Sequence, residues 1–346
     1  MFKVGINGLG RIGRAILRSN IEKKFFEIVA INDINPDNEN IAYTLNYDTI
    51  YGRLTNQFET QGTSIVQNEG NPIEIFHESS ISSVPWEALE VDFVIDSSGV
   101  KKNVTDARKL ISEDRVRKVF VTHCPNEVDF TMVLGANEAA LDVKNHNIIS
   151  TSICDATAIS PVLKVIDDNF GFSTASITTA HPWLSYQNLQ DGPSSSWSVP
   201  GEVYHHFALG RSAIGNIIPK PTSAVEASCD VLENINPNMI LSFSYRTPTA
   251  IVGSADITIN LKSEVKREEV INLFETKEKE QKFSIFKNNL EPLVSLDFVK
   301  ADYSCVIDHR WTDIIDHKML KLVLWYDNEW GYSNKVLDQI KFVSES

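Results

Sequence analysis

The chain has 346 residues, a length that accommodates two domains. Hydrophobic residues make up 42% and charged residues 23% of it, which is typical of a globular protein and excludes a disordered one. The net charge of −14, without a basic stripe, argues against binding to nucleic acid or to an anionic membrane surface.

The four cysteines are widely scattered and form no CxxC pair. This spacing favours a reduced protein without a disulfide framework or a zinc framework, so no metal site is expected. The first expected strand starts at residue 2, which leaves no room for a signal peptide, and no apolar run reaches membrane-spanning length. We therefore expect a cytoplasmic protein.

The N-terminal segment FKVGINGLGRIGRAIL has the order strand, glycine turn, helix. In this context Gly8 makes the turn, Gly10 lets the backbone approach a pyrophosphate, and Gly13 lets the helix pack on the strand. The helix N-terminus then offers N–H groups to the phosphates. Asp33 ends a second strand, EIVAIND, where a carboxylate accepts hydrogen bonds from ribose hydroxyls and repels a 2′-phosphate. The segment predicts a dinucleotide-binding domain that prefers NAD to NADP.

Apolar strands continue to alternate with amphipathic segments up to about residue 150. Strands are expected within 91–99 and 116–123, with a crossover helix over 103–115 between them. This βαβ alternation predicts a parallel, doubly wound sheet, in which ligands bind at the carboxyl ends of the strands. The candidates for that edge are Asp96, Ser98, Gly99, Thr122 and His123.

Two segments in the middle of the chain carry a candidate nucleophile and its base. STSICDAT presents Cys154 on a small-residue turn, and His181 lies at the end of the strand-like run ASITTAH. A neighbouring His can take the thiol proton, so that the sulfur attacks a carbonyl carbon. A lone Cys is usually a small buried hydrophobe, and the pair alone leaves the two interpretations equal. Beside a dinucleotide domain, the pair favours oxidation of an aldehyde through a thiohemiacetal and a thioester.

Beyond Cys154 the chain is richer in long β-strand patterns. A helix is expected in ISPVLKVIDDNFG, ending at Gly171, and an amphipathic helix over 264–282. We expect a mostly antiparallel sheet with helices on one side. The Gly/Pro/Ser-rich stretch 187–216 is long for a loop, which is uncommon unless a loop is functional or disordered. Its large side chains are interpreted as solvated loop residues rather than metal ligands: Trp197, Tyr204, His205 and His206.

Segments along the whole chain carry a resemblance to one family: INGLGRIGR, LNYDTIYGRL, the Cys154 turn, TTAH, DGPS, NIIP, EPLVSLDF and LVLWYDNEWGYSN. With these, the chain closely resembles glyceraldehyde-3-phosphate dehydrogenases. The resemblance implies an α/β protein: a Rossmann NAD-binding domain over 1–153, an α+β catalytic domain over 154–330, and a final helix, 331–346, that packs back on the first domain. It also implies a homotetramer, in which the 187–216 loop lines a neighbouring subunit's cofactor pocket.

The resemblance assigns roles residue by residue. Cys154 falls on the nucleophile and His181 on the base that later acts as acid, with the Cys154 backbone N–H as an oxyanion donor. Arg246 falls on an arginine shared by two anion sites, and Thr222 on a threonine of the inorganic-phosphate site, followed by Ser223 where the family has glycine. The cofactor positions are Asn7, Gly8, Gly10, Arg11, Ile12, Asp33 and Ser98, together with Asn328 at the nicotinamide carboxamide and Tyr332 beside that ring. Thr122 is added to the cofactor residues from its place at the sheet edge.

Three departures from the family pattern concern the anion sites. Asp155 stands where a phosphate-binding threonine is usual, and a carboxylate about 4 Å from a dianion costs roughly 1 to 4 kcal/mol. It should also raise the pKa of the Cys154 thiol. Leu184 and Tyr186 replace small polar ligands of the substrate phosphate.

These departures leave three functions open. The first is a phosphorylating, NAD-dependent dehydrogenase of glyceraldehyde 3-phosphate or a close analogue. The second is a non-phosphorylating dehydrogenase of another sugar phosphate or aldehyde, as in erythrose-4-phosphate dehydrogenases, with Asp155 orienting a water molecule toward the thioester. The third is a non-catalytic NAD-binding scaffold, against which the retention of both Cys154 and His181 argues. The sequence does not decide which aldehyde is used, nor whether phosphate or water is the acyl acceptor.

Overall fold

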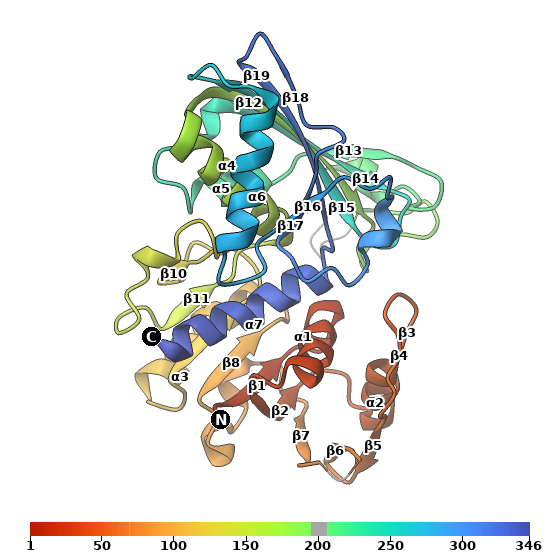
Figure 1. Ribbon diagram of the computed structural model, residues 1–346. Coiled ribbons are helices and arrows are strands. Elements are labelled where there is room, and N and C mark those ends of the chain that lie inside the picture. The colour runs from red at the N-terminus through yellow and green to blue at the C-terminus, as the bar shows by residue number, and fades with distance from the viewer. Residues whose placement is uncertain (69, 195–205) are drawn as a thin grey trace. The chain divides into compact units, whose positions relative to one another are not determined.

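The computed structural model describes residues 1–68, 70–194 and 206–346 (Figure 1). Trp197, Tyr204 and His205 of the long loop lie outside the described residues. The chain forms two compact units, the first made of residues 1–132, 139–152 and 336–346 and the second of 133–138 and 153–335. Among the described helices, none combines the length and the apolar sequence that crossing a bilayer requires.

The first unit is built on a nine-stranded sheet with the order β10-β11-β9-β8-β1-β2-β7-β6-β5. Neighbouring strands are parallel from β10 to β7, and the pairs β7–β6 and β6–β5 are antiparallel. The strands are β1 (Lys3–Asn7), β2 (Glu27–Asn32), β5 (Phe58–Gln61), β6 (Ser64–Gln67), β7 (Ile73–Phe76), β8 (Phe93–Asp96), β9 (Lys118–Val121), β10 (Phe130–Thr131) and β11 (Ile148–Ser150). This is the parallel sheet of a Rossmann domain with an antiparallel edge.

The helices of the first unit connect these strands. They are α1 (Arg11–Lys23), α2 (Asn38–Asn46) and α3 (Lys101–Ser112), and the short hairpin of β3 (Tyr47–Asp48) and β4 (Gly52–Arg53) links α2 to β5. The last helix, α7 (Trp330–Glu345), contributes its C-terminal part to this unit. There Lys341 Nζ lies 4.3 Å from the ring centre of Phe25, and Lys23 pairs with Asp338 at 3.6 Å.

The second unit is built on an eight-stranded mixed sheet with the order β13-β14-β12-β15-β19-β17-β16, and β18 pairs with β19. All pairs are antiparallel except β12–β14 and β16–β17, which agrees with the mostly antiparallel sheet that we predicted. The strands are β12 (Phe172–Pro182), β13 (Ile218–Lys220), β14 (Ile240–Thr247), β15 (Gly253–Leu261), β16 (Phe286–Asn289), β17 (Cys305–Asp308), β18 (Asp313–Ile315) and β19 (Met319–Tyr326).

The helices of this unit are α4 (Cys154–Phe170), α5 (Ala224–Cys229) and α6 (Arg267–Glu280). The helix expected from Ile159 begins at Cys154 instead, and Pro161 lies inside it. Ile153 is extended and its carbonyl oxygen accepts from Thr157 N at 2.9 Å, which starts the helical hydrogen bonds before the proline. Cys154 is therefore the first residue of a helix rather than part of a turn.

Candidate active site

Cys154 and His181 come together although they are 27 positions apart in the chain. The sulfur lies at the start of α4, and His181 is the penultimate residue of β12. Cys154 Sγ and His181 Nε2 are 3.5 Å apart. Cys154 is half-buried and His181 is buried.

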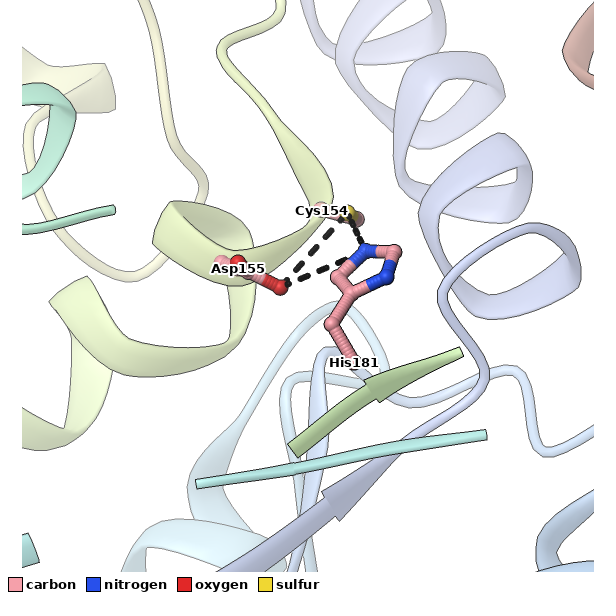
Figure 2. Close-up of side chains that lie close together, drawn as sticks. All are labelled: Cys154, Asp155 and His181. Carbon is pink, nitrogen blue, oxygen red and sulfur yellow. Dashed lines mark hydrogen bonds and ion pairs between the residues drawn. The ribbon is translucent and has the colours of Figure 1, made fainter. Parts of the chain in front are cut away.

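Asp155 completes a compact group of three side chains. In Figure 2 its carboxylate points toward Cys154 and His181, with Oδ1 3.7 Å from the sulfur and 3.8 Å from Nε2. Tyr326, at the end of β19, donates its hydroxyl proton to the same Oδ1 at 2.8 Å. The buried Tyr326 hydroxyl therefore fixes the carboxylate, and Asp155 belongs to the active site rather than to solvent.

The electrostatics of this group favour the protonated form of the thiol. Burial raises the pKa of Cys154 well above its usual value, and the Asp155 charge raises it further, as its sequence position predicted. Burial lowers the pKa of His181, Asp155 opposes that effect and Arg246 adds to it. A neutral imidazole next to a thiol has the chemistry of a general base, which can take the proton when the sulfur attacks.

Strand pairing positions His181 for this role. β12 and β14 run parallel with His181 opposite Arg246. The base form needs its ring proton on Nδ1, and the Pro182 carbonyl oxygen, 2.7 Å from Nδ1, is the acceptor that holds it there. Arg246 Nη1 donates to the same carbonyl at 2.9 Å and lies 2.5 Å from Nδ1, to which it donates in the other tautomer, with the ring proton on Nε2.

Arg246 is the best-placed cation for an anionic substrate. It is only 4% exposed, and its Nε has no hydrogen-bond partner among the described residues. Thr222 follows β13, and its hydroxyl oxygen accepts from Ala224 N at 3.1 Å. Ser223 directly precedes α5. These residues were predicted from the sequence and all lie in the second unit.

Two residues of the site were missed by the sequence analysis. One is Tyr326, which contacts Asp155 as described above. The other is Lys220, the last residue of β13, whose pKa is lowered by burial and by Arg246 and raised by the charges of Asp155 and Cys154. Lys220 therefore interacts electrostatically with both groups. A basic residue two positions before Thr222, in NIIPKPT, was the available signal.

The substituted substrate-phosphate positions lie in a tight turn after β12. Leu184 donates its backbone N–H to Gln187 Oε1 at 3.1 Å, and Gln187 N donates back to the Leu184 carbonyl at 2.9 Å. Leu184 and Tyr186 are both half-buried. Leu184 offers no side-chain donor, so the turn can contact an anion only through its backbone or through other side chains.

The glycine turn of the first unit fits a dinucleotide. A Cβ on Gly8, whose φ is +90°, would lie 2.6 Å from the Ser98 backbone, and one on Gly13 would lie 2.2 Å from the Gly8 oxygen. A Cβ on Gly10 would meet no atom within 4 Å among the described residues, so the surroundings of Gly10 leave room for a pyrophosphate. Asp33 follows β2, and its Oδ2 accepts from Leu9 N at 2.6 Å, which holds a carboxylate beside the turn.

The other predicted cofactor residues of this unit form a hydrogen-bonded edge. Asn7 Nδ2 and Ser98 Oγ donate to Asp96 Oδ1 at 2.8 and 2.6 Å, and Thr122 Oγ1 donates to the Asp96 carbonyl oxygen at 3.3 Å. Burial raises the pKa of Asp96. These hydroxyl and amide groups therefore form hydrogen bonds at the carboxyl edge of the sheet.

Four further predicted residues lie at strand and helix ends. Arg11 Nη1 pairs with Asp48 at 2.5 Å, and the neighbouring Ile12 is half-buried. In the second unit Asn328 Oδ1 accepts from Val252 N at 3.1 Å, which orients its amide, and Tyr332 lies in the first turn of α7. Asn328 comes two residues after Tyr326, so the segment that fixes Asp155 also carries the predicted carboxamide ligand.

Two family sequence models match this chain. Residues 2–104 match the NAD binding domain of glyceraldehyde 3-phosphate dehydrogenase, and residues 153–328 match its C-terminal domain. Glyceraldehyde-3-phosphate dehydrogenase 2 of Streptomyces avermitilis is 34% identical over 342 residues, covering 99% of this chain and 98% of its own. The cytosolic enzyme of Gracilaria gracilis is 34% identical over 343 residues, with 99% and 98% coverage, and glyceraldehyde-3-phosphate dehydrogenase 1 of Bacillus subtilis is 34% identical over 344 residues, also with 99% and 98%.

Proposed function

This chain belongs to the glyceraldehyde-3-phosphate dehydrogenase family and is an NAD-dependent oxidoreductase that acts on an aldehyde; we propose that its substrate is glyceraldehyde 3-phosphate and its acyl acceptor inorganic phosphate. The observation that carries the proposal is the approach of Cys154 Sγ to His181 Nε2 at 3.5 Å, with Arg246 beside the imidazole. The same pair argues against the non-catalytic scaffold.

The reaction begins when the Cys154 sulfur forms a bond to the aldehyde carbon. His181 Nε2 takes the thiol proton, and the carbonyl oxygen becomes the oxyanion of a thiohemiacetal, for which the backbone N–H at the start of α4 is the proposed donor. Bound NAD supplies a hydride acceptor, and loss of hydride from that carbon leaves a thioester on Cys154. Attack by a phosphate oxygen then breaks the C–S bond, and the thiol regains its proton from His181.

Cofactor binding is proposed for the residues that shape the glycine turn and the sheet edge. The open space at Gly10 and the start of α1 would receive the pyrophosphate, and the Asp33 carboxylate would receive the ribose hydroxyls. Asn328 and Tyr332 are proposed for the nicotinamide end, because Val252 N holds the Asn328 amide in one orientation.

Anion recognition rests on Arg246, Thr222 and Ser223, with Lys220 added. Asp155 brings a negative charge to the place where phosphate must attack. Arg246 acts electrostatically on Cys154, and Lys220 interacts with both Cys154 and Asp155, so positive charge accompanies that carboxylate. The cations support inorganic phosphate as the acyl acceptor, and the Asp155 carboxylate lowers the affinity for it.

The substitution Asp155→Thr tests the acceptor. We expect NADH formation by the wild type to require phosphate and the KM for phosphate to fall roughly 10-fold or more in the variant, because a charge about 4 Å away is removed. The measurement is NADH absorbance with glyceraldehyde 3-phosphate and NAD, at a series of phosphate concentrations.

Asp168→Thr is the matched control, since Asp168 is an exposed carboxylate on the same helix that pairs only with Lys164 in the described contacts. It should leave the phosphate dependence unchanged. Wild-type turnover that is independent of phosphate and releases the free acid would contradict the proposal and favour water as the acceptor.

We also propose that the chain assembles into a homotetramer in the cytoplasm. Leu241, Phe243 and Tyr245 alternate along β14 on one face, with Leu241 77% exposed, and the Phe243 and Tyr245 rings contact each other at 4.9 Å. An apolar row of this kind on a strand is typical of a subunit interface. The cytosolic name of the Gracilaria gracilis relative and the free thiols of all four cysteines support the location.

The substitution Leu241→Glu tests this face. We expect the variant to elute as a smaller species than the wild type in size-exclusion chromatography with light scattering, because a buried unpaired charge opposes association. Leu290→Glu is the control and should not change the mass, because Leu290 lies in the loop after β16 and is 64% exposed. An unchanged mass for Leu241→Glu would exclude this row from the interface.

A further inference from the structure

The side chains of Cys154, Asp155 and His181 present one sulfur, one oxygen and one nitrogen atom to a common point (Figure 2). Their separations are 3.5 Å for S···N, 3.7 Å for S···O and 3.8 Å for N···O. Tetrahedral zinc, with bonds of about 2.3 Å to sulfur and about 2.0 to 2.1 Å to nitrogen and oxygen, needs ligand separations of roughly 3.3 to 3.6 Å. The three atoms thus stand within a few tenths of an ångström of a zinc triad.

We propose that Cys154 Sγ, Asp155 Oδ1 and His181 Nε2 form a Zn²⁺ site with an open fourth position, and that zinc bound there reversibly blocks the dehydrogenase. The donor set favours this ion, since thiolate and imidazole suit zinc whereas Mg²⁺ and Ca²⁺ prefer oxygen ligands. Within the part of the chain that the structure describes, no second group of three such ligands is found.

Groups around the triad fix two of its ligands. With the ring proton on Nδ1, the Pro182 carbonyl oxygen at 2.7 Å accepts it, and the Nε2 lone pair is left for a metal. The Tyr326 hydroxyl donates to Asp155 at 2.8 Å and restrains the carboxylate. Outer contacts of this kind orient ligands in known zinc sites.

Charge supports the site and also limits its affinity. A thiolate and a carboxylate less than 4 Å apart repel each other, and a divalent cation between them converts that repulsion into attraction. Arg246 and Lys220 are cations that act on the same groups and oppose the metal. Removal of the Lys220 charge should therefore tighten metal binding, whereas removal of the Asp155 charge should weaken it.

Zinc at this site inhibits the dehydrogenase because it binds the electron pairs that the reaction with the aldehyde needs. The sulfur lone pair that would attack the aldehyde and the Nε2 lone pair that would take the thiol proton are both donated to the ion. This inhibitory part rests on the proposed function, whereas the binding of the metal does not.

Titration of the full chain with Co²⁺ tests the site, because cobalt replaces zinc and gives a thiolate-to-metal charge-transfer absorption. We expect one Co²⁺ to bind per chain with this absorption, and Zn²⁺ to displace it. In Asp155→Asn the binding should be at least about 10- to 100-fold weaker, because the loss of a residue that only hydrogen-bonds to a metal ligand already weakens binding by that factor. Lys220→Gln should bind more tightly. Asp168→Asn and Cys229→Ser are the controls and should bind as the wild type does.

Two results would overturn the site: an absorption that survives in Cys154→Ser, or unchanged affinity in Asp155→Asn, a variant that keeps an oxygen to accept from Tyr326. The outcomes also separate the two proposals. Metal binding as expected in a chain that does not oxidise glyceraldehyde 3-phosphate would defeat the proposed function alone. An active dehydrogenase that binds no Co²⁺ through its thiolate would defeat only the zinc site.

Discussion

Cys154→Ser is expected to abolish NADH formation from glyceraldehyde 3-phosphate, with kcat reduced by roughly 10⁴-fold or more, the order of loss seen when a covalent nucleophile is removed. A serine hydroxyl in the same position ionises far less readily than a thiol, and the buried, carboxylate-lined environment that raises the pKa of Cys154 disfavours an alkoxide still more. The measurement is the initial rate of NADH formation at saturating substrate.

The control for this variant is Cys229→Ser, which removes another half-buried thiol of the second unit. Burial raises the pKa of Cys229 to about 11, and it lies at the end of α5 rather than in the triad, so its replacement should leave the rate unchanged. NAD binding, followed by quenching of protein fluorescence, should persist in Cys154→Ser and show that the protein is folded. Substantial turnover by Cys154→Ser would exclude the thioester route.

His181→Asn should lower kcat/KM by about 10² to 10⁴, the usual contribution of a general base. Because burial and Asp155 raise the pKa of the thiol, its attack should depend on transfer of the proton to Nε2 at 3.5 Å. The remaining rate of the variant should rise steeply with pH, since hydroxide then has to remove the proton. The rate of the wild type should also rise with pH, but over a lower pH range.

Alkylation of Cys154 by iodoacetamide separates activation of the thiol from the later steps. At neutral pH the wild type should react faster than His181→Asn, and Asp155→Asn should react faster than the wild type, because the Asp155 charge is one of the causes that raise the pKa of the thiol. Equal alkylation rates in wild type and His181→Asn across the pH range would show that His181 is not the base.

Much of this architecture was predictable because its determinants are local. The turn was predictable from its glycines alone, since the φ of +90° at Gly8 favours a residue without a side chain. The parallel sheet followed from apolar runs separated by helical segments, and the alternation of buried residues in β15 marks a sheet covered on one face. The start of α4 was not predicted, because Pro161 suggested a later beginning whereas the extended Ile153 sets an earlier one.

The sequence by itself determined the family and the two kinds of sheet, and it predicted the nucleophile and the base, because each depends on residue types within short segments. Only the tertiary structure decided what surrounds the sulfur. Arg246 reaches His181 across 65 positions of sequence because β12 and β14 are neighbouring strands, and Tyr326 at the end of β19 reaches Asp155 on α4 across 171 positions. Side-chain separations of a few ångströms depend on strand order and register, which no local pattern encodes. From the sequence, Asp155 was only a substitution at a predicted phosphate site. The structure shows that its carboxylate also contacts both the thiol and the imidazole.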